Sequence, residues 1–152
     1  MVSVPRSHAD RWGHQQTASP RVLIVDDDDE VRRLSADLMA RAGFEVDTAD
    51  DGATGWKAIC YSSYDLVVVD NDLPQLTGLE LIRRMRAVAI DLPCILVSGR
   101  MLGRETALDR VIQPGAILPK PFLPAVLMTQ AERLLLARME SGLAENWPGT
   151  RG

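Results

Sequence analysis

The sequence is poor in cysteine and in aromatic residues, and it contains no long apolar run. Its two cysteines, Cys60 and Cys94, lie outside any CxxC motif and away from any histidine pair. A disulfide framework and a zinc site are therefore not expected, and both thiols are predicted to fill the core of a protein from a reducing compartment. No apolar segment approaches the roughly 18 residues of a membrane span, and the N-terminus lacks the apolar stretch of a signal peptide.

An excess of positive charge is also missing. The chain of 152 residues has 17 basic and 21 acidic side chains, a formal net charge of −4, and only 5% aromatic residues. Nucleic acids and anionic membranes are bound by basic surfaces, and single strands also by stacked aromatic rings. The composition therefore argues against nucleic acid and membrane as partners, and it predicts a cytoplasmic globular protein.

The two ends of the chain differ in composition from its middle. Residues 1–19 are polar and show neither helical nor strand periodicity, so they are predicted to form a disordered arm. Residues 141–152 are predicted to form a loose tail. Residues 20–140, between these ends, are predicted to form a single folded domain, which suits a chain of this length.

Short apolar segments alternate with amphipathic ones inside this domain. Strands are predicted over residues 22–25, 44–48, 66–69, 94–97 and 117–120. Helices are predicted over residues 31–42, after residue 52, and over residues 77–86, 104–112 and 124–139. Continuous apolar strands separated by helices form a parallel sheet that is covered on both faces. The prediction is an α/β fold, a flavodoxin-like doubly wound sheet of five strands in the order 2-1-3-4-5 with five helices.

Polar residues follow four of the five predicted strands. Asp26 and Asp27 follow the first, Asp70 the third, Ser98 the fourth, and Lys120 ends the fifth. In an open α/β sheet, ligands bind at the carboxyl ends of the strands. Crowded carboxylates are costly unless a cation joins them, and Mg²⁺ prefers such oxygen ligands. A carboxylate beside Mg²⁺ suits formation of an acyl phosphate, whose charged oxygens the ammonium and hydroxyl groups can neutralise.

The acidic residues also fit a purely structural interpretation. Carboxylates are favoured at the start of a helix by capping and by the helix dipole, and Asp28 and Asp29 are assigned to that role. For Asp26 and Asp27, taken alone, both interpretations stay open. Asp70 directly follows four apolar residues, where a carboxylate is poorly solvated, and this favours a functional role.

Four segments follow one another in a familiar order, namely VLIVDDDDEVRRL, LVVVDNDLPQLTGLELIRRMR, ILVSG and LPKPF. Together they resemble the receiver domain (CheY-like) of two-component response regulators over roughly residues 20–140. The resemblance implies that Asp70 is the phosphoacceptor. It also implies that Mg²⁺ is the cofactor, held by Asp26, Asp27, Asp70 and the main-chain carbonyl of Asp72.

The same resemblance assigns roles at the ends of the last two strands. Ser98 matches the hydroxyl that turns toward the phosphoryl group, and Lys120 matches the lysine that pairs with it. Pro121 matches a proline that the family holds in the cis conformation. Ile117 stands where the family often has an aromatic ring, so coupling of Ser98 to a moving ring is not expected.

The resemblance implies a stand-alone response regulator that is not an enzyme and that accepts a phosphoryl group from a sensor histidine kinase or a histidine phosphotransfer protein. Because no further domain is expected after the last helix, the output would be onward phosphotransfer or contact with an unknown protein. A homodimer through helices four and five is one such contact. Asp72 and Arg100 are expected to pair over the phosphoryl group and to slow its hydrolysis.

Two alternatives stay open at this stage. A haloacid-dehalogenase-like phosphatase has an Asp-x-Asp motif that the segment VVVDNDLP mimics, although that family has the motif on its first strand. A binding module with the receiver fold would not be phosphorylated, and it would not need the five residues at the strand ends.

Overall fold

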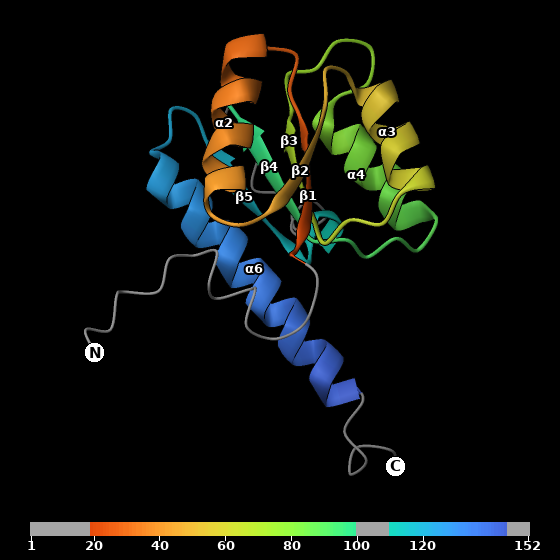
Figure 1. Cartoon of the computed structure of the whole chain (residues 1–152). Helices are drawn as coiled ribbons and strands as arrows, with labels where there is room; N and C mark the ends of the chain where they lie inside the picture. The colour runs from red at the N-terminus through yellow and green to blue at the C-terminus, as the bar shows by residue number, and fades with distance from the viewer. Residues whose placement is uncertain (1–18, 100–109, 146–152) are drawn as a thin grey trace, which may run out of the picture.

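The computed structural model describes residues 19–99 and 110–145, and its five strands form one parallel sheet (Figure 1). The strands are β1 Arg21–Val25, β2 Glu45–Ala49, β3 Leu66–Asp70, β4 Cys94–Ser98 and β5 Gly115–Pro119. Their order across the sheet is β2-β1-β3-β4-β5. This confirms the predicted fold class and strand order.

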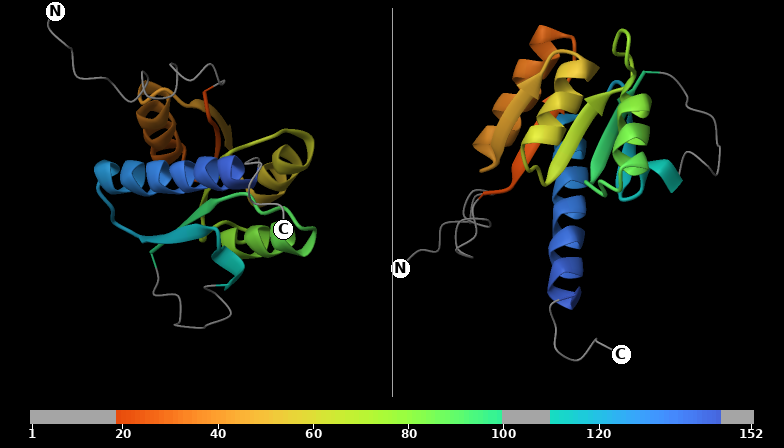
Figure 2. Two further views of the ribbon diagram at one scale, coloured as in Figure 1. Left: turned by 90° about the horizontal axis from the view of Figure 1, so that it is seen from below. Right: turned by 90° about the vertical axis from the view of Figure 1, so that its right-hand side faces the viewer.

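Helices cover both faces of the sheet. They are α2 Asp29–Arg41, α3 Gly52–Tyr61, α4 Gly78–Ala87 and α6 Pro124–Glu145. Residues 110–112 are also helical, and the remainder of the helix predicted over residues 104–112 lies outside the described residues. With that segment, the fold has the five helices expected. Helices α3 and α4 lie on one face of the sheet, and α2 and α6 lie on the other (Figure 2).

The last helix is longer than predicted. α6 continues past Met139 to Glu145, so residues 141–145 are helical rather than part of a loose tail. Leu, Ala and Glu follow Gly142, and all three are good helix formers. The arm of residues 1–18 and residues 146–152 lie outside the described residues. In the described part of the chain, no helix has the length and hydropathy needed to cross a membrane.

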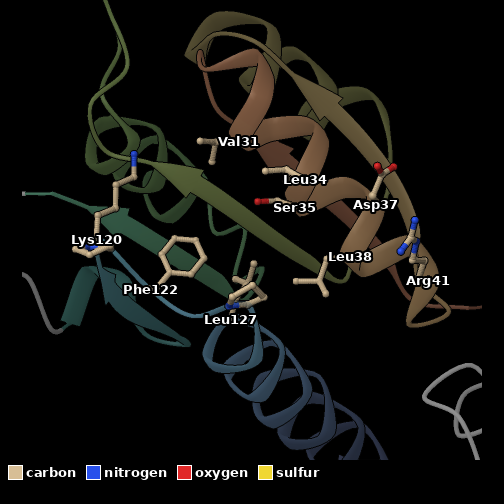
Figure 3. A pocket seen from close by; sticks show the side chains of 11 residues that line it. Val31, Leu34, Ser35, Asp37, Leu38, Arg41, Lys120, Phe122 and Leu127 are labelled. Atoms are coloured by element: carbon tan, nitrogen blue, oxygen red, sulfur yellow. The ribbon is translucent and has the colours of Figure 1, made fainter.

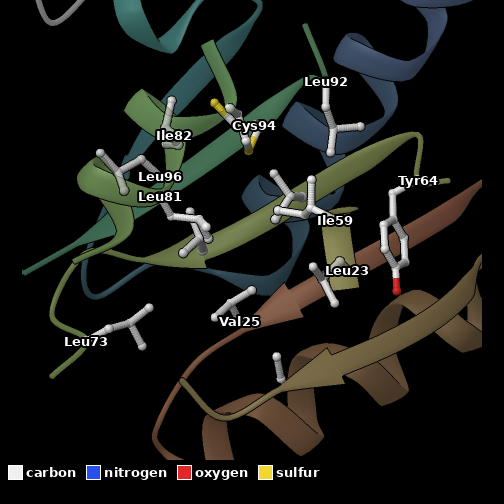
Figure 4. Packing of buried hydrophobic residues seen from close by; sticks show 14 of the residues in the cluster. Leu23, Val25, Ile59, Tyr64, Leu73, Leu81, Ile82, Leu92, Cys94 and Leu96 are labelled. Carbon is white, nitrogen blue, oxygen red and sulfur yellow. The ribbon is translucent and has the colours of Figure 1, made fainter. Parts of the chain in front are cut away.

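Two apolar clusters, one on each face of the sheet, form the core. Alternate residues of β1 point to opposite faces, so Leu23 and Val25 pack with α3 and α4, as Figure 4 shows, whereas Val22 and Ile24 pack with α2 and α6. Residues of β3 and β4 divide between the clusters in the same way. Strands that are buried on both faces must be apolar throughout, which explains the continuous runs in the sequence.

Two side chains in predicted helices, those of Leu34 and Cys60, do not contribute to the core. Leu34 belongs to the apolar stripe of α2 but is 63% exposed, because Met39 makes the buried contact of this helix with the sheet. Cys94 is buried, but Cys60 is exposed, so the prediction that both thiols fill the core is wrong for Cys60. The adjacent Ile59 is the buried residue, and neighbouring helical residues point about 100° apart.

Candidate functional site

The carboxyl ends of the strands meet at one edge of the sheet and carry the predicted site residues. The described part of the chain buries three polar or charged side chains, those of Asp26, Asp70 and Ser98, and all three lie at this edge. The Lys120 N–H donates to the Ser98 carbonyl at 2.8 Å, which joins the end of β5 to the end of β4. Burying carboxylates is costly, so their concentration here indicates a site rather than a packing feature.

Three carboxylates form an acidic cluster. Asp26, Asp27 and Asp70 each offer an oxygen, and these oxygens lie within 4.8 Å of one another. Burial raises the pKa of Asp26, and repulsion from Asp70 adds to this rise. A hydrogen bond from the Asp28 N–H to Asp26 Oδ1, at 2.9 Å, opposes it. Crowded and mutually repelling oxygens are the donor set that a hard divalent cation stabilises, so these residues fit Mg²⁺.

Lys120 supplies the positive charge beside this cluster. Its Nζ lies 2.7 Å from Asp70 Oδ2. Burial alone lowers the pKa of Lys120, but the hydrogen bond and charge of Asp70, helped by Asp26 and Asp72, raise it above its ordinary value. The side chain therefore stays an ammonium group. The peptide bond between Lys120 and Pro121 is cis, as the resemblance implied.

Of the remaining predicted residues, Asp72 lies in the loop after β3 and Ile117 lies in β5. Asp72 is exposed, and its N–H donates to Asp70 Oδ1 at 3.0 Å, which keeps its main chain beside Asp70. Its role as a carbonyl ligand stays a prediction. Arg100 lies outside the described residues, so its predicted pairing with Asp72 does too. Ile117 pairs with Leu96 in the sheet and is 39% exposed.

The structure adds two residues that the sequence did not single out. Asn71 accepts a hydrogen bond from the Leu79 N–H through its Oδ1, at 3.0 Å, and so fastens the start of α4 to the end of β3. Arg32 donates from Nη1 to the carbonyl of Asp26 at 2.9 Å. Asn71 directly follows Asp70 in the sequence, and this position could have drawn attention to it. In the sequence, by contrast, nothing distinguishes Arg32 from Arg33.

An apolar groove lies beside the site, between α2 and the segment that leads from β5 into α6 (Figure 3). Its volume is about 790 Å³. Leu34 and Leu38 line it from α2, and Phe122 and Leu127 line it from the opposite side. Lys120 is also part of its lining, so the groove reaches the side chain that contacts Asp70.

Comparison with known sequences agrees with the geometry. The family described as response regulator receiver domain matches residues 22–132. The transcriptional regulatory protein PrrA of Mycobacterium tuberculosis is 36% identical over 124 residues, which cover 79% of this chain and 52% of PrrA. The response regulator MprA of a Mycobacterium species is 34% identical over 119 residues, which cover 76% and 50%. This chain thus spans about half the length of these relatives.

Solved structures share the fold. A CheY-like receiver domain from Methanospirillum hungatei superposes with a TM-score of 0.75 at 24% identity, covering 81% of this chain and 98% of that one. The response regulator TrrA of Thermotoga maritima, solved in complex with Mg(2+)-BeF, superposes with a TM-score of 0.68 at 28% identity, covering 76% and 98%. Since the family match extends over most of the sequence and the fold agrees, this chain belongs to the response regulator receiver domain family.

Proposed function

We propose that this receiver domain accepts a phosphoryl group on Asp70 in a Mg²⁺-dependent reaction. The observation that carries the proposal is the environment of Asp70, which is 4% exposed, belongs to the acidic cluster, and lies 2.7 Å from the Lys120 ammonium. The similar protein TrrA was solved in complex with Mg(2+)-BeF, which supports Mg²⁺ as the cation of this receiver domain. We propose a histidine kinase or a histidine phosphotransfer protein as the donor.

In the proposed transfer, a carboxylate oxygen of Asp70 forms a bond to phosphorus while the P–N bond of the donor's phosphohistidine breaks. The imidazole nitrogen keeps the electron pair and takes a proton from water. Asp26, Asp27, Asp70 and the carbonyl of Asp72 would hold Mg²⁺, which supplies positive charge for the phosphoryl oxygens.

Lys120 and Ser98 act on the remaining phosphoryl charge. Lys120 is bound to the Asp70 carboxylate in this structure, and that carboxylate loses its charge when it becomes an acyl phosphate. The ammonium is then free to pair with a phosphoryl oxygen. We propose that Ser98, at the end of β4, donates its hydroxyl to another phosphoryl oxygen. No side chain of this set is consumed except Asp70, so the chain acts as an acceptor rather than as an enzyme.

We propose that the donor docks in the groove beside Lys120. Its lining is mostly apolar and includes Leu34, a residue that is 63% exposed. Apolar grooves of this kind accept the apolar face of a partner helix. A donor bound against α2 would present its phosphohistidine next to Lys120 and Asp70. The output proposed is onward phosphotransfer or a contact with another protein that changes on phosphorylation.

The observed topology disfavours the phosphatase alternative. A haloacid-dehalogenase-like enzyme would have its Asp-x-Asp motif on the first strand, whereas Asp70 ends the third and has acidic partners from the first.

The relatives PrrA and SilR are named as transcriptional regulatory proteins, SilR as a probable one. Because the chain matches only about half of PrrA, we propose no transcriptional role for it.

Mass spectrometry of the intact chain tests the proposal. The protein is incubated with acetyl phosphate, with and without Mg²⁺, beside an Asp70→Asn variant. We expect one labile phosphoryl adduct that needs both Mg²⁺ and Asp70. A folded chain that binds Mg²⁺ but forms no adduct would indicate the unphosphorylated binding module. Continuous release of phosphate with turnover would indicate the phosphatase.

A further inference from the structure

Arg32 reaches from the beginning of α2 back to the end of β1. Its Nη1 donates to the main-chain carbonyl of Asp26 at 2.9 Å, and its Nη2 donates to Asp29 Oδ1 at 2.5 Å. The Arg32 side chain is only 16% exposed, whereas that of Asp29 is 75% exposed. The guanidinium group is therefore held by Asp26 and Asp29 and is largely shielded from solvent.

These contacts restrain Asp26 at two points. Its carboxylate accepts the Asp28 N–H at 2.9 Å, and its carbonyl accepts Arg32. That carbonyl belongs to the peptide unit that joins Asp26 to Asp27, and a peptide unit is planar. Holding the carbonyl therefore fixes the orientation of this peptide unit, which contains the Cα atom that carries the Asp27 side chain. Asp26 and Asp27 are two of the three residues in the acidic cluster.

We propose that Arg32 is a positioning residue for the acidic cluster, which orients the carboxylates of Asp26 and Asp27 toward Mg²⁺ by holding the carbonyl of Asp26. This inference rests on the proposed function, since it assigns Mg²⁺ to the cluster. Arg32 acts through Asp26 and Asp27, because its hydrogen bonds go to a main-chain carbonyl and to Asp29. Groups that orient metal ligands in this way commonly control metal affinity.

Charge alone predicts the opposite effect, and this makes the inference testable. A guanidinium group close to the cluster repels a cation, so its removal should strengthen Mg²⁺ binding if charge were all that mattered. Removal of a positioning group should weaken binding. Arg33 supplies the matched control, because it is the next residue of α2, carries the same charge and is exposed.

The test titrates Mg²⁺ alone into the full chain and follows the heat of binding and the amide resonances of Asp27 and Asp70. We expect Arg32→Gln to weaken Mg²⁺ binding roughly tenfold and to alter the resonance shift of Asp27. Arg33→Gln should bind as tightly as the wild type or more tightly. Arg32→Lys keeps the charge but has a single ammonium in place of the planar fork, so it should bind more weakly than the wild type.

The outcomes separate this inference from the proposed function. If the wild type binds no Mg²⁺, the proposed function fails. If the wild type binds and Arg32→Gln binds as tightly as Arg33→Gln, the positioning role alone is overturned. Circular dichroism reports whether each variant is folded. Should Arg32→Gln be unfolded, Arg32→Lys decides: weaker binding supports the role, and wild-type affinity overturns it.

Discussion

The ammonium of Lys120 lies 2.7 Å from Oδ2 of Asp70, and the two residues come from opposite sides of β4. Asp70 ends β3, Lys120 follows β5, and β4 lies between them. The contact therefore exists only when three strands are paired in register. It places the Lys120 ammonium against Asp70, which at 4% is the least exposed carboxylate of the acidic cluster.

Replacing Lys120 should destabilise the fold more than replacing the other lysine. Lys120→Met leaves Asp70 buried among carboxylates without its partner, and we expect the free energy of unfolding to fall by about 1–2 kcal/mol. Lys57→Met, at an exposed position of α3, should change it little. Urea unfolding monitored by circular dichroism measures both. Adding Asp70→Asn to Lys120→Met should restore part of the loss, and equal effects of the two lysine substitutions would contradict the pairing.

Gly78, the first residue of α4, lies against the end of β3. A Cβ atom there would come within 2.5 Å of the Asp70 carbonyl and 2.9 Å of Leu96 Cδ1. Gly78→Ala should therefore destabilise the protein by roughly 1–3 kcal/mol. Gly142→Ala is the control, since nothing lies within 4 Å of its added Cβ, and it should stabilise α6 by about 0.5 kcal/mol. Thermal unfolding of the two variants should shift in opposite directions; a shift in the same direction would refute this packing argument.

Asp28 caps the N-terminus of α2. Its carboxylate accepts the N–H groups of Glu30 and Val31 at 3.0 and 3.2 Å. We expect Asp28→Ala to lower the free energy of unfolding by about 1 kcal/mol, because two N–H groups lose their acceptor. Asp37→Ala, at an exposed position inside the same helix, should leave stability unchanged or raise it. Urea denaturation compares the two, and an equal loss for both would show that capping is not the cause.

Cys94 makes stability depend on pH in the alkaline range. Burial raises the pKa of its thiol from 9.0 to about 11. Between these values the unfolded chain loses the thiol proton and the folded chain keeps it, so stability falls as the pH rises. Urea unfolding at about pH 8 and about pH 10.5 should show this fall, on the order of 2 kcal/mol. Cys94→Ala should lessen this loss of stability, whereas Cys60→Ala, at an exposed site, should not. Identical pH dependence in both variants would show that the Cys94 thiol is not the cause.

Leu34 tests the docking groove. We expect Leu34→Glu to lower the ratio of the phosphorylation rate with a histidine kinase to the rate with acetyl phosphate by at least about fivefold, because the kinase alone needs the groove. Val88→Glu is the control, since Val88 is similarly exposed, at 59%, and caps the end of α4 on the other face of the sheet. Radiolabel transfer measures both rates. An unchanged ratio for Leu34→Glu would place the donor elsewhere.

The sequence by itself determined the architecture and the identity of the residues at the strand ends. Runs such as 66–69 are apolar because both faces of β3 are buried, and a parallel sheet follows from strands of that kind. Asp70 and Lys120 could be placed at one edge because parallel strands end together. These conclusions depend only on period and order along the chain.

The tertiary structure decided which of several equivalent residues make each contact. Leu34 and Met39 are both apolar residues of α2, yet Met39 faces the sheet and Leu34 faces the groove. Arg32 and Arg33 are adjacent and of the same type, but they point about 100° apart. Of the two, it is Arg32 that donates a hydrogen bond to the Asp26 carbonyl. A hydropathy pattern shows that a helix has an apolar side. The rotation of that helix is set by the sheet and the neighbouring helix against which it packs.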